Sequence, residues 1–360
     1  MKKIILTGGG TAGHVMPNLA LLPYLKERGF EVFYIGAEKS IEQELAEKHG
    51  IPFHSIRTGK MRRDKILSVK NFKDAFGFVG GIRDAKDIIK KIRPDVIFSK
   101  GGFVGLPVAM AARRCRVPLI LHESDLTSGL ANRLSIRYAK RICVSFPETL
   151  KELPAEKAVF TGNPIRQELY KGDTSKARKL CGFADNKPIA LIMGGSSGSE
   201  LLNNVVLEAL PLLLPKFNII HLAGKGKLGG AQLKYGYKAF EFLTDEMPDM
   251  LAAADIIVSR AGANAINEFL ALRKPALLIP LARATRGDQI DNAKSFAARG
   301  FAKILSEADL NVDTLTNEIE ILFAEKDKYV SNMINSPLFD TNNEVMEIIL
   351  SVVTCASAAN

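Results

Sequence analysis

Short apolar runs alternate with longer amphipathic stretches along most of the chain. In the first half, runs typical of buried parallel strands lie at residues 3–7, 31–35, 96–99, 118–121, 142–144 and 158–160. Helical patterns separate them, at about 14–28, 40–49, 81–92, 105–115 and 129–139. The second half repeats the scheme, with strands expected at 189–193, 218–222, 239–242, 255–258 and 276–279, and helices at about 200–213, 246–253, 263–271 and 288–299.

This alternation predicts an α/β protein with two Rossmann-like, doubly wound parallel-sheet domains that face each other across a cleft. A length of 360 residues also favours two domains over one core. We expect an N-terminal domain over residues 1–162 and a C-terminal domain over 163–336, joined through the segment TGNPIR at 161–166. A final helical pattern at 337–352 can pack back on the first domain.

A glycine-rich loop follows the first predicted strand of each half. The first is GGGTAGH at 8–14, and the second is GGSSG at 194–198. Where a strand leads through glycines into a helix, backbone N–H groups and the positive end of the helix dipole point at a bound anion. The two loops therefore predict phosphate groups bound in both halves.

The first loop by itself matches a dinucleotide-binding pattern, with Glu38 at about the expected distance. A nicotinamide-dependent oxidoreductase would leave the second loop without a role, so we do not favour it. His14 stands where the first helix begins. The helix dipole disfavours a positive charge there, so a neutral imidazole that accepts a proton is one reading, and a capping histidine is the other.

A third strand–turn–helix segment is SRAGANAINE at 259–268. Its backbone N–H groups near 263–265 suit a phosphate. Glu268 follows in the helix and can accept two hydrogen bonds from a ribose diol, although a lone helix glutamate is commonly just solvated. We favour the ribose. Farther on, the polar segment DQIDNA at 288–293 suits the hydroxyls of a sugar.

The net charge of +10 is concentrated in residues 57–93, where twelve Lys or Arg face four Asp or Glu. Interleaved apolar residues suit an anionic membrane surface, but a solvated helix with its apolar side on the core explains the same pattern. We expect no nucleic-acid partner, because no recognised motif accompanies the charge. No apolar run reaches a bilayer-spanning length, no signal peptide is expected, and the four cysteines lack metal or disulfide spacing.

Eight motifs occur together and in order: GGGTAGH at 8–14, KGGFVGLP at 100–107, HES at 122–124, SGLANR at 128–133, TGNPIR at 161–166, GGSSGS at 194–199, SRAGANAINE at 259–268 and DQIDNA at 288–293. In this set the chain resembles the MurG family of bacterial undecaprenyl-diphospho-muramoylpentapeptide N-acetylglucosaminyltransferases, which are GT-B enzymes of glycosyltransferase family 28. The resemblance covers nearly the whole chain.

The resemblance implies inverting transfer of N-acetylglucosamine from UDP-N-acetylglucosamine to the 4-hydroxyl of the muramoyl sugar of lipid I, which gives lipid II for peptidoglycan synthesis. It implies no cofactor and no metal ion. It also implies a peripheral enzyme on the cytoplasmic face of the bacterial cell membrane, reached through segment 57–93. Two alternatives stay open: an epimerase acting on UDP-N-acetylglucosamine alone, and a transferase to another lipid such as diacylglycerol.

The resemblance also assigns roles to residues. The catalytic candidates are His14 and Glu123. The donor candidates are Thr11, Ala12, Gly13, Asp125, Arg166, Ser196 for the diphosphate, Leu243 for uracil, Ala263, Asn264, Ala265, Glu268 for the ribose, and Gln289 for the sugar. The acceptor diphosphate is assigned to Gly9, Gly10, Thr11 and Gly102. The family commonly carries His-Glu-Gln-Asn where this chain has HESD at 122–125, so Asp125 keeps an acceptor oxygen, lacks an amide donor and adds a negative charge.

Overall fold

The computed structural model describes residues 2–58, 69–195, 198–228, 235–281, 288–336 and 340–357; for 69–76 and 356–357 only the backbone is described. Contacts divide the chain into two units, Met1–Arg166 with Asp340–Asn360, and Gln167–Phe339. Within the described ranges, no helix combines the length and the apolar character that a membrane span requires.

The first unit is built on a seven-stranded sheet in the order β3-β2-β1-β4-β5-β6-β7, and every pairing is parallel. The strands are β1 (Lys2–Thr7), β2 (Phe30–Ala37), β3 (Phe53–Ile56), β4 (Val96–Ser99), β5 (Leu119–Glu123), β6 (Arg141–Val144) and β7 (Ala158–Phe160). The strand order reverses between β1 and β4. In such sheets, ligands bind outside the carboxyl ends of the strands at the reversal point.

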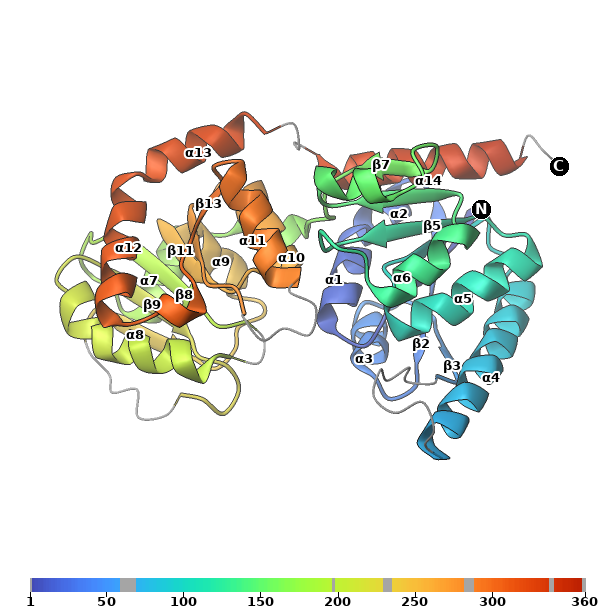
Figure 1. The fold of residues 1–360 in the computed structure, drawn as a ribbon, viewed down its shortest axis with the longest axis horizontal. Helices are drawn as coiled ribbons and strands as arrows, with labels where there is room; N and C mark the ends of the chain where they lie inside the picture. The colour runs from blue at the N-terminus through green and yellow to red at the C-terminus, as the bar shows by residue number, and fades with distance from the viewer. Residues whose placement is uncertain are drawn as a thin grey trace. The chain divides into compact units, whose positions relative to one another are not determined.

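Helices cover both faces of this sheet (Figure 1). They are α1 (Ala12–Ala20), α2 (Leu22–Glu27), α3 (Ile41–Lys48), α4 (Val69–Ile92), α5 (Gly102–Cys115), α6 (Leu130–Ser135) and α14 (Thr341–Ser357), with 3-10 turns η1 (Ile136–Tyr138) and η2 (Pro147–Glu152). Alternate side chains of β1 are buried in the apolar cores on opposite faces of the sheet. Ile4 and Leu6 pack with α14, whereas Ile5 packs with α4 and α5. This two-sided burial explains the continuous apolar runs of the strands.

The C-terminal helix α14 belongs to the first unit although it follows the second in sequence. Its residues Val345, Ile349 and Val352 are buried in the same core as β1. At its start, the Asn342 side chain accepts a hydrogen bond from the Ile165 N–H (2.8 Å) and donates one to the Ile165 carbonyl (2.7 Å). The helix therefore covers one face of the sheet of the first unit. It also holds Ile165 in place by hydrogen bonds, where the chain leaves that unit.

The second unit has a six-stranded sheet in the order β10-β9-β8-β11-β12-β13, again entirely parallel. Its strands are β8 (Ile189–Met193), β9 (Asn218–Leu222), β10 (Tyr237–Phe240), β11 (Ile256–Ser259), β12 (Ala276–Leu278) and β13 (Ala302–Ile304). Its helices are η3 (Gln167–Lys171), α7 (Thr174–Cys181), α8 (Glu200–Leu213), α9 (Met247–Ala253), α10 (Ala263–Ala271), α11 (Asp288–Ala298), η4 (Glu307–Asp309), α12 (Val312–Ala324) and α13 (Lys326–Ile334). Here the order reverses between β8 and β11.

The prediction of two doubly wound parallel α/β sheets is confirmed. Several expected boundaries were wrong. The strand expected at 239–242 is β10 and ends at Phe240, the helix expected at 81–92 begins at Val69, and the helix expected at 14–28 is two helices. The break between these two helices falls before Pro23. The backbone nitrogen of proline carries no hydrogen, so it cannot donate the hydrogen bond that would continue α1. The pattern also missed β3, β13, α7, α12 and α13.

Candidate active site

One candidate site lies wholly in the second unit, at the carboxyl ends of β8, β11 and β12. It is a cavity of about 920 Å³, large enough for a nucleotide sugar. Its wall is formed by Gly194, Gly195 and Gly198 after β8, by Ala265 in the first turn of α10, and by Gln289 in the first turn of α11. The second glycine loop and the SRAGANAINE segment therefore meet in one cavity, as the carboxyl-edge rule requires.

Close backbone packing explains the glycines of this loop. Gly198 has a φ of +67°, and a Cβ there would lie 2.1 Å from the carbonyl oxygen of Ala223, at the end of β9. A Cβ on Gly194 would lie 2.6 Å from the backbone nitrogen of Ser199, the N-cap of α8. Only glycine allows the loop to fold this tightly onto the neighbouring strand. Ser196 lies outside the described residues.

A buried ion pair at this cavity was missed by sequence reasoning. Arg260 is 7% exposed, and its guanidinium donates to Glu307 Oε1 (2.5 Å), Ser199 Oγ (2.6 Å) and the Ile279 carbonyl (3.0 Å). It joins the loops after β8, β11 and β12 and the turn after β13. An arginine directly after a buried strand was the available signal, but its partners are 47 and 61 residues away in sequence.

The remaining donor candidates of this unit differ in their surroundings. Ala263 and Asn264 begin α10, and Glu268 lies half-buried farther along the same helix. The Gln289 side-chain oxygen accepts the Leu281 N–H (3.0 Å), which fixes the start of α11. Leu243 is 9% exposed and lies three residues beyond the end of β10, so it does not follow that strand directly.

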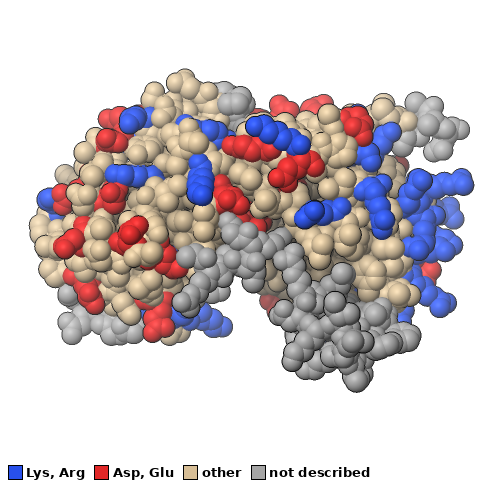
Figure 2. All heavy atoms as spheres, in the orientation of Figure 1, with Lys and Arg blue, Asp and Glu red and all other residues tan. Residues whose placement is uncertain are grey.

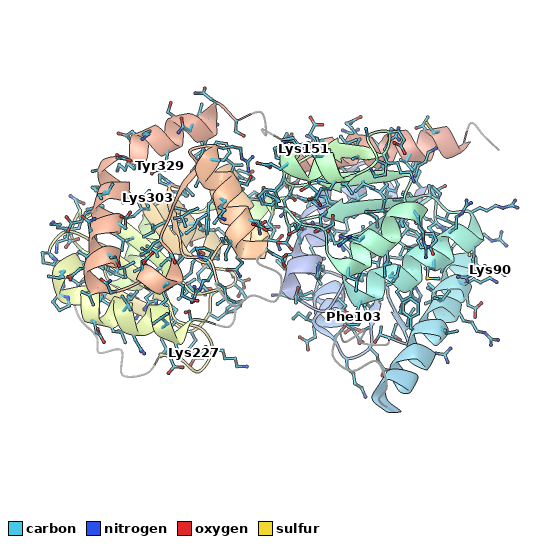
Figure 3. All side chains as sticks on the ribbon, viewed as in Figure 1. Lys90, Phe103, Lys151, Lys227, Lys303 and Tyr329 are labelled. Atoms are coloured by element: carbon cyan, nitrogen blue, oxygen red, sulfur yellow. The ribbon has the colours of Figure 1, made fainter. Side chains whose placement is uncertain are left out.

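Lys227 is a further residue that the sequence did not single out (Figure 3). Its exposed side chain donates to the Gly198 carbonyl at 3.3 Å, which places a positive charge beside the second glycine loop. Arg166, by contrast, is the last residue of the first unit.

A second candidate site lies in the first unit, at the carboxyl ends of β1, β4 and β5. The loops after β1 and β4 touch, because a Cβ on Gly102 would lie 2.3 Å from the Gly9 carbonyl oxygen. The ring of Phe103, labelled in Figure 3, lies against Gly10, where a Cβ would lie 2.9 Å from it. Of the residues assigned to the acceptor diphosphate, the structure thus brings Gly9 and Gly102 together, and Thr11 is exposed as the N-cap of α1.

A buried carboxylate lies directly beneath this first loop. Glu42 is fully buried and accepts the Ala37 N–H (3.2 Å) and the Gly10 N–H (3.4 Å). A Cβ on Gly9 would lie 2.3 Å from its Oε1. The Gly10 N–H is therefore directed toward the protein, so an anion at this loop would use other donors. Sequence reasoning did not single out Glu42, because its partner lies 32 residues away.

The two catalytic candidates differ in how they are held. His14 is half-buried in the first turn of α1, with its Nδ1 3.4 Å from Thr11 Oγ1. Glu123 is 7% exposed and accepts three hydrogen bonds, from the Asn132 side chain (2.8 Å) and from the backbone N–H groups of Gly129 (3.1 Å) and Asp125 (3.2 Å). Burial raises the pKa of the Glu123 carboxyl. Its geometry is that of a side chain that shapes the loop after β5.

Lys100 is a further residue whose role sequence reasoning did not single out. It follows β4 and is 1% exposed. Its ammonium lies 2.5 Å from Ser124 Oγ, 2.7 Å from His122 Nδ1 and 3.0 Å from Asn163 Oδ1. His122 Nε2 in turn lies 2.9 Å from the Gly162 carbonyl. Burial lowers the pKa of Lys100 to about 7.

Two family models match the chain. The glycosyltransferase family 28 N-terminal domain matches residues 4–144, and the C-terminal domain of the same family matches residues 189–349. This chain belongs to glycosyltransferase family 28. It is thus an enzyme of the hexosyltransferase class, and the matched segments contain the cavity of the second unit and the loops after β1, β4 and β5 of the first.

Two curated relatives match this family 28 chain over nearly their full length. Each is named UDP-N-acetylglucosamine–N-acetylmuramyl-(pentapeptide) pyrophosphoryl-undecaprenol N-acetylglucosamine transferase. The Clostridium tetani protein is 50% identical over 97% of this chain and 97% of its own length. The Lachnospira eligens protein is 51% identical over 97% of this chain and 99% of its own.

Among solved structures, MurG of Acinetobacter baumannii superposes on the family 28 chain with a TM-score of 0.77 at 26% identity, over 98% of this chain and all of that one. The GT-B fold expected from the sequence is therefore confirmed. Within the described ranges, no group of three or more His, Cys, Asp or Glu side chains is placed to hold a metal ion.

Proposed function

We propose that the chain transfers N-acetylglucosamine from UDP-N-acetylglucosamine to the 4-hydroxyl of the MurNAc-pentapeptide of lipid I, and so forms lipid II for peptidoglycan synthesis. The observation that carries this proposal is the relationship to the named transferases, at about half identity over 97% of the chain. The two carboxyl-edge sites support it, because the reaction needs one site for a nucleotide sugar and one for a lipid diphosphate.

The donor fits the cavity of the second unit. The second glycine loop, with Ser196, and the first turn of α10 over Ala263–Ala265 supply backbone N–H groups to the UDP diphosphate. Glu268 accepts the ribose hydroxyls, Leu243 meets uracil through its backbone, and Gln289 meets the sugar. Arg166 adds a positive charge for the donor. Arg260, which Glu307 neutralises, holds the loops around the diphosphate in place.

The acceptor fits the first unit. Its diphosphate is held by the loop of Gly9, Gly10 and Thr11 together with Gly102, and the side chain of Thr11 and the N-terminus of α1 supply the donors that Gly10 does not. The loop at 11–13 and Asp125 also face the sugar that is transferred. This arrangement assigns residues 1–166 with α14 to the acceptor and 167–339 to the donor.

The reaction needs a base for the acceptor hydroxyl and a stabilised leaving group. His14 takes the proton of the 4-hydroxyl, the oxygen attacks the anomeric carbon from the face opposite UDP, and the anomeric carbon–oxygen bond to UDP breaks with its electron pair going to the diphosphate. Helix N-termini stabilise the charge that develops on UDP. We assign Glu123 to positioning the loop of Asp125, since its carboxylate already accepts three hydrogen bonds.

We assign the approach to lipid I to the basic end of the first unit, at the cytoplasmic face of the membrane. Figure 2 shows Lys and Arg side chains gathered there, and Val79 of α4 is 64% exposed. Such a surface favours anionic lipid headgroups. The part of segment 57–93 at 59–68 lies outside the described residues. Among the described side chains of α4, α5 and the turns after them, the exposed basic residues are Arg83, Lys90, Lys91, Arg93, Arg113, Arg114 and Arg116.

Radiolabelled UDP-N-acetylglucosamine incubated with a soluble lipid I analogue tests the function. The expected product is a labelled disaccharide-lipid whose formation depends on both substrates. A labelled isomer of the free donor sugar, formed without lipid, would instead identify an epimerase. Labelled product with diacylglycerol but not with the lipid I analogue would identify a transferase to another lipid.

A further inference from the structure

Lys100, His122, Ser124 and Asn163 form a hydrogen-bonded cluster in which none of the four side chains carries a step of the proposed reaction. It joins three segments of the first unit at the carboxyl edge of its sheet: the end of β4, the loop after β5 that carries Ser124, and the exit segment that carries Asn163. The backbone N–H of Lys100 also donates to the Thr7 carbonyl (2.9 Å), at the end of β1. The side chain therefore lies below the point where the acceptor loops converge.

The contacts of Lys100 suit a charged ammonium. A carbonyl can only accept, so His122 Nε2 donates to Gly162 and leaves Nδ1 to accept from Lys100. Burial and the nearby Lys100 charge lower the pKa of His122 well below its usual range, which agrees with a neutral ring. The Ser124 hydroxyl and the Asn163 carbonyl oxygen complete three acceptors for three N–H donors.

The charges that face Lys100 are mostly negative. Glu123 at the end of β5 and Asp125 in the following loop both favour its charged form, whereas burial opposes it. Asp125 is half-buried and its N–H donates to Glu123. A carboxylate at this edge would repel a diphosphate unless a cation offsets it, and the buried Lys100 ammonium is such a cation.

We propose that Lys100 is a positioning residue, which holds Ser124 and Asn163 in place beneath the acceptor loops and offsets the carboxylate of Asp125 so that an anionic lipid substrate can bind beside it. This inference rests on the proposed function, since its measurement is transfer to lipid I. The role is structural and electrostatic, because a side chain that is 1% exposed does not touch the substrate.

The test compares Lys100→Gln, Asp125→Asn and the double variant, with Lys151→Met on the exposed 3-10 turn η2 as the matched control. Glutamine keeps N–H donors and removes the charge. We expect Lys100→Gln to lower kcat/KM for the lipid I analogue at least about tenfold, mainly through KM for the acceptor, with the donor KM near the wild-type value. Adding Asp125→Asn is expected to restore most of that loss, because the negative charge of the Asp125 loop beside the acceptor is then removed.

Wild-type protein without disaccharide-lipid product would overturn the proposed function itself. Wild-type turnover with an unchanged Lys100→Gln variant, or a loss that Asp125→Asn does not relieve, would overturn the charge-offsetting role. If Lys100→Gln does not fold, Asp125→Asn alone decides: removing the Asp125 charge while Lys100 is kept should lower the acceptor KM at least about threefold, and an unchanged KM would contradict the inference.

Discussion

Replacing Gly198 by alanine probes how the second glycine loop is held against β9. Gly198 combines a φ of +67° with a Cβ position 2.1 Å from the Ala223 carbonyl oxygen and 2.9 Å from the Gly224 Cα. Gly182, which ends α7 in the same unit, has a similar φ of +73° but no atom within 4 Å of a Cβ. Gly182→Ala is therefore the matched control for the backbone conformation alone.

The magnitudes follow from these two environments. A left-handed conformation costs a residue with a Cβ about 1–2 kcal/mol, which is the whole effect expected for Gly182→Ala. Gly198→Ala adds the displacement of a neighbouring backbone, an overpacking effect of about 1–3 kcal/mol. The total is about 2–5 kcal/mol for Gly198→Ala, at roughly 2–4 °C of melting temperature per kcal/mol for a unit of this size.

Two measurements check the expected losses of stability and of UDP affinity in Gly198→Ala. Circular dichroism follows thermal unfolding, since the chain contains no tryptophan, and added UDP identifies the transition of the unit that binds it. Calorimetric titration then gives the UDP affinity, which should fall at least about tenfold in Gly198→Ala and stay unchanged in Gly182→Ala. Equal melting temperatures for the two variants would refute the packing argument, and unchanged UDP affinity would remove this loop from the donor site.

Glu268→Ala should weaken donor binding by about 1–3 kcal/mol, the loss of a charge-assisted hydrogen bond; an unaltered affinity in calorimetry would contradict the ribose contact. His14→Ala should lower kcat about 10²–10⁴-fold with near-normal UDP affinity, and unchanged turnover would exclude His14 as the base. Burial lowers the pKa of His221 to about 4, so the unfolded chain takes up this proton first as pH falls from about 6.5. As the pH falls from about 6.5 to about 4, the free energy of unfolding of the wild type should therefore fall by up to about 3 kcal/mol more than that of His221→Gln. Equal changes in the two free energies, measured by urea unfolding across this pH range, would refute it. Replacing Arg113 and Arg114 in the last turn of α5, and Arg116 just after it, by glutamine should weaken co-sedimentation with anionic vesicles in low salt. Vesicle binding that does not change with salt concentration would argue against an electrostatic approach.

Local pattern predicted much of this fold. Apolar runs matched β8, β9 and β7 residue for residue, and the glycine loops lay where strands lead into helices. Two of the four edge strands, β3 and β13, were missed because FHSI and AKI are short and carry polar residues. Such strands are recognised by the neighbours with which they pair, and pairing is not a local property.

The sequence alone determined the alternation of strands and helices in both halves, the two glycine loops and the family, because each depends on residues that are close in the chain. Only the tertiary structure showed how the loops are supported. Glu42 reaches Gly10 across 32 residues, Lys100 reaches Asn163 across 63, and Asn342 reaches Ile165 across 177. These contacts depend on which strands lie side by side, since neighbouring carboxyl ends bring distant loops together. A polar side chain buried by such a neighbour looks, in the sequence, like any other surface residue.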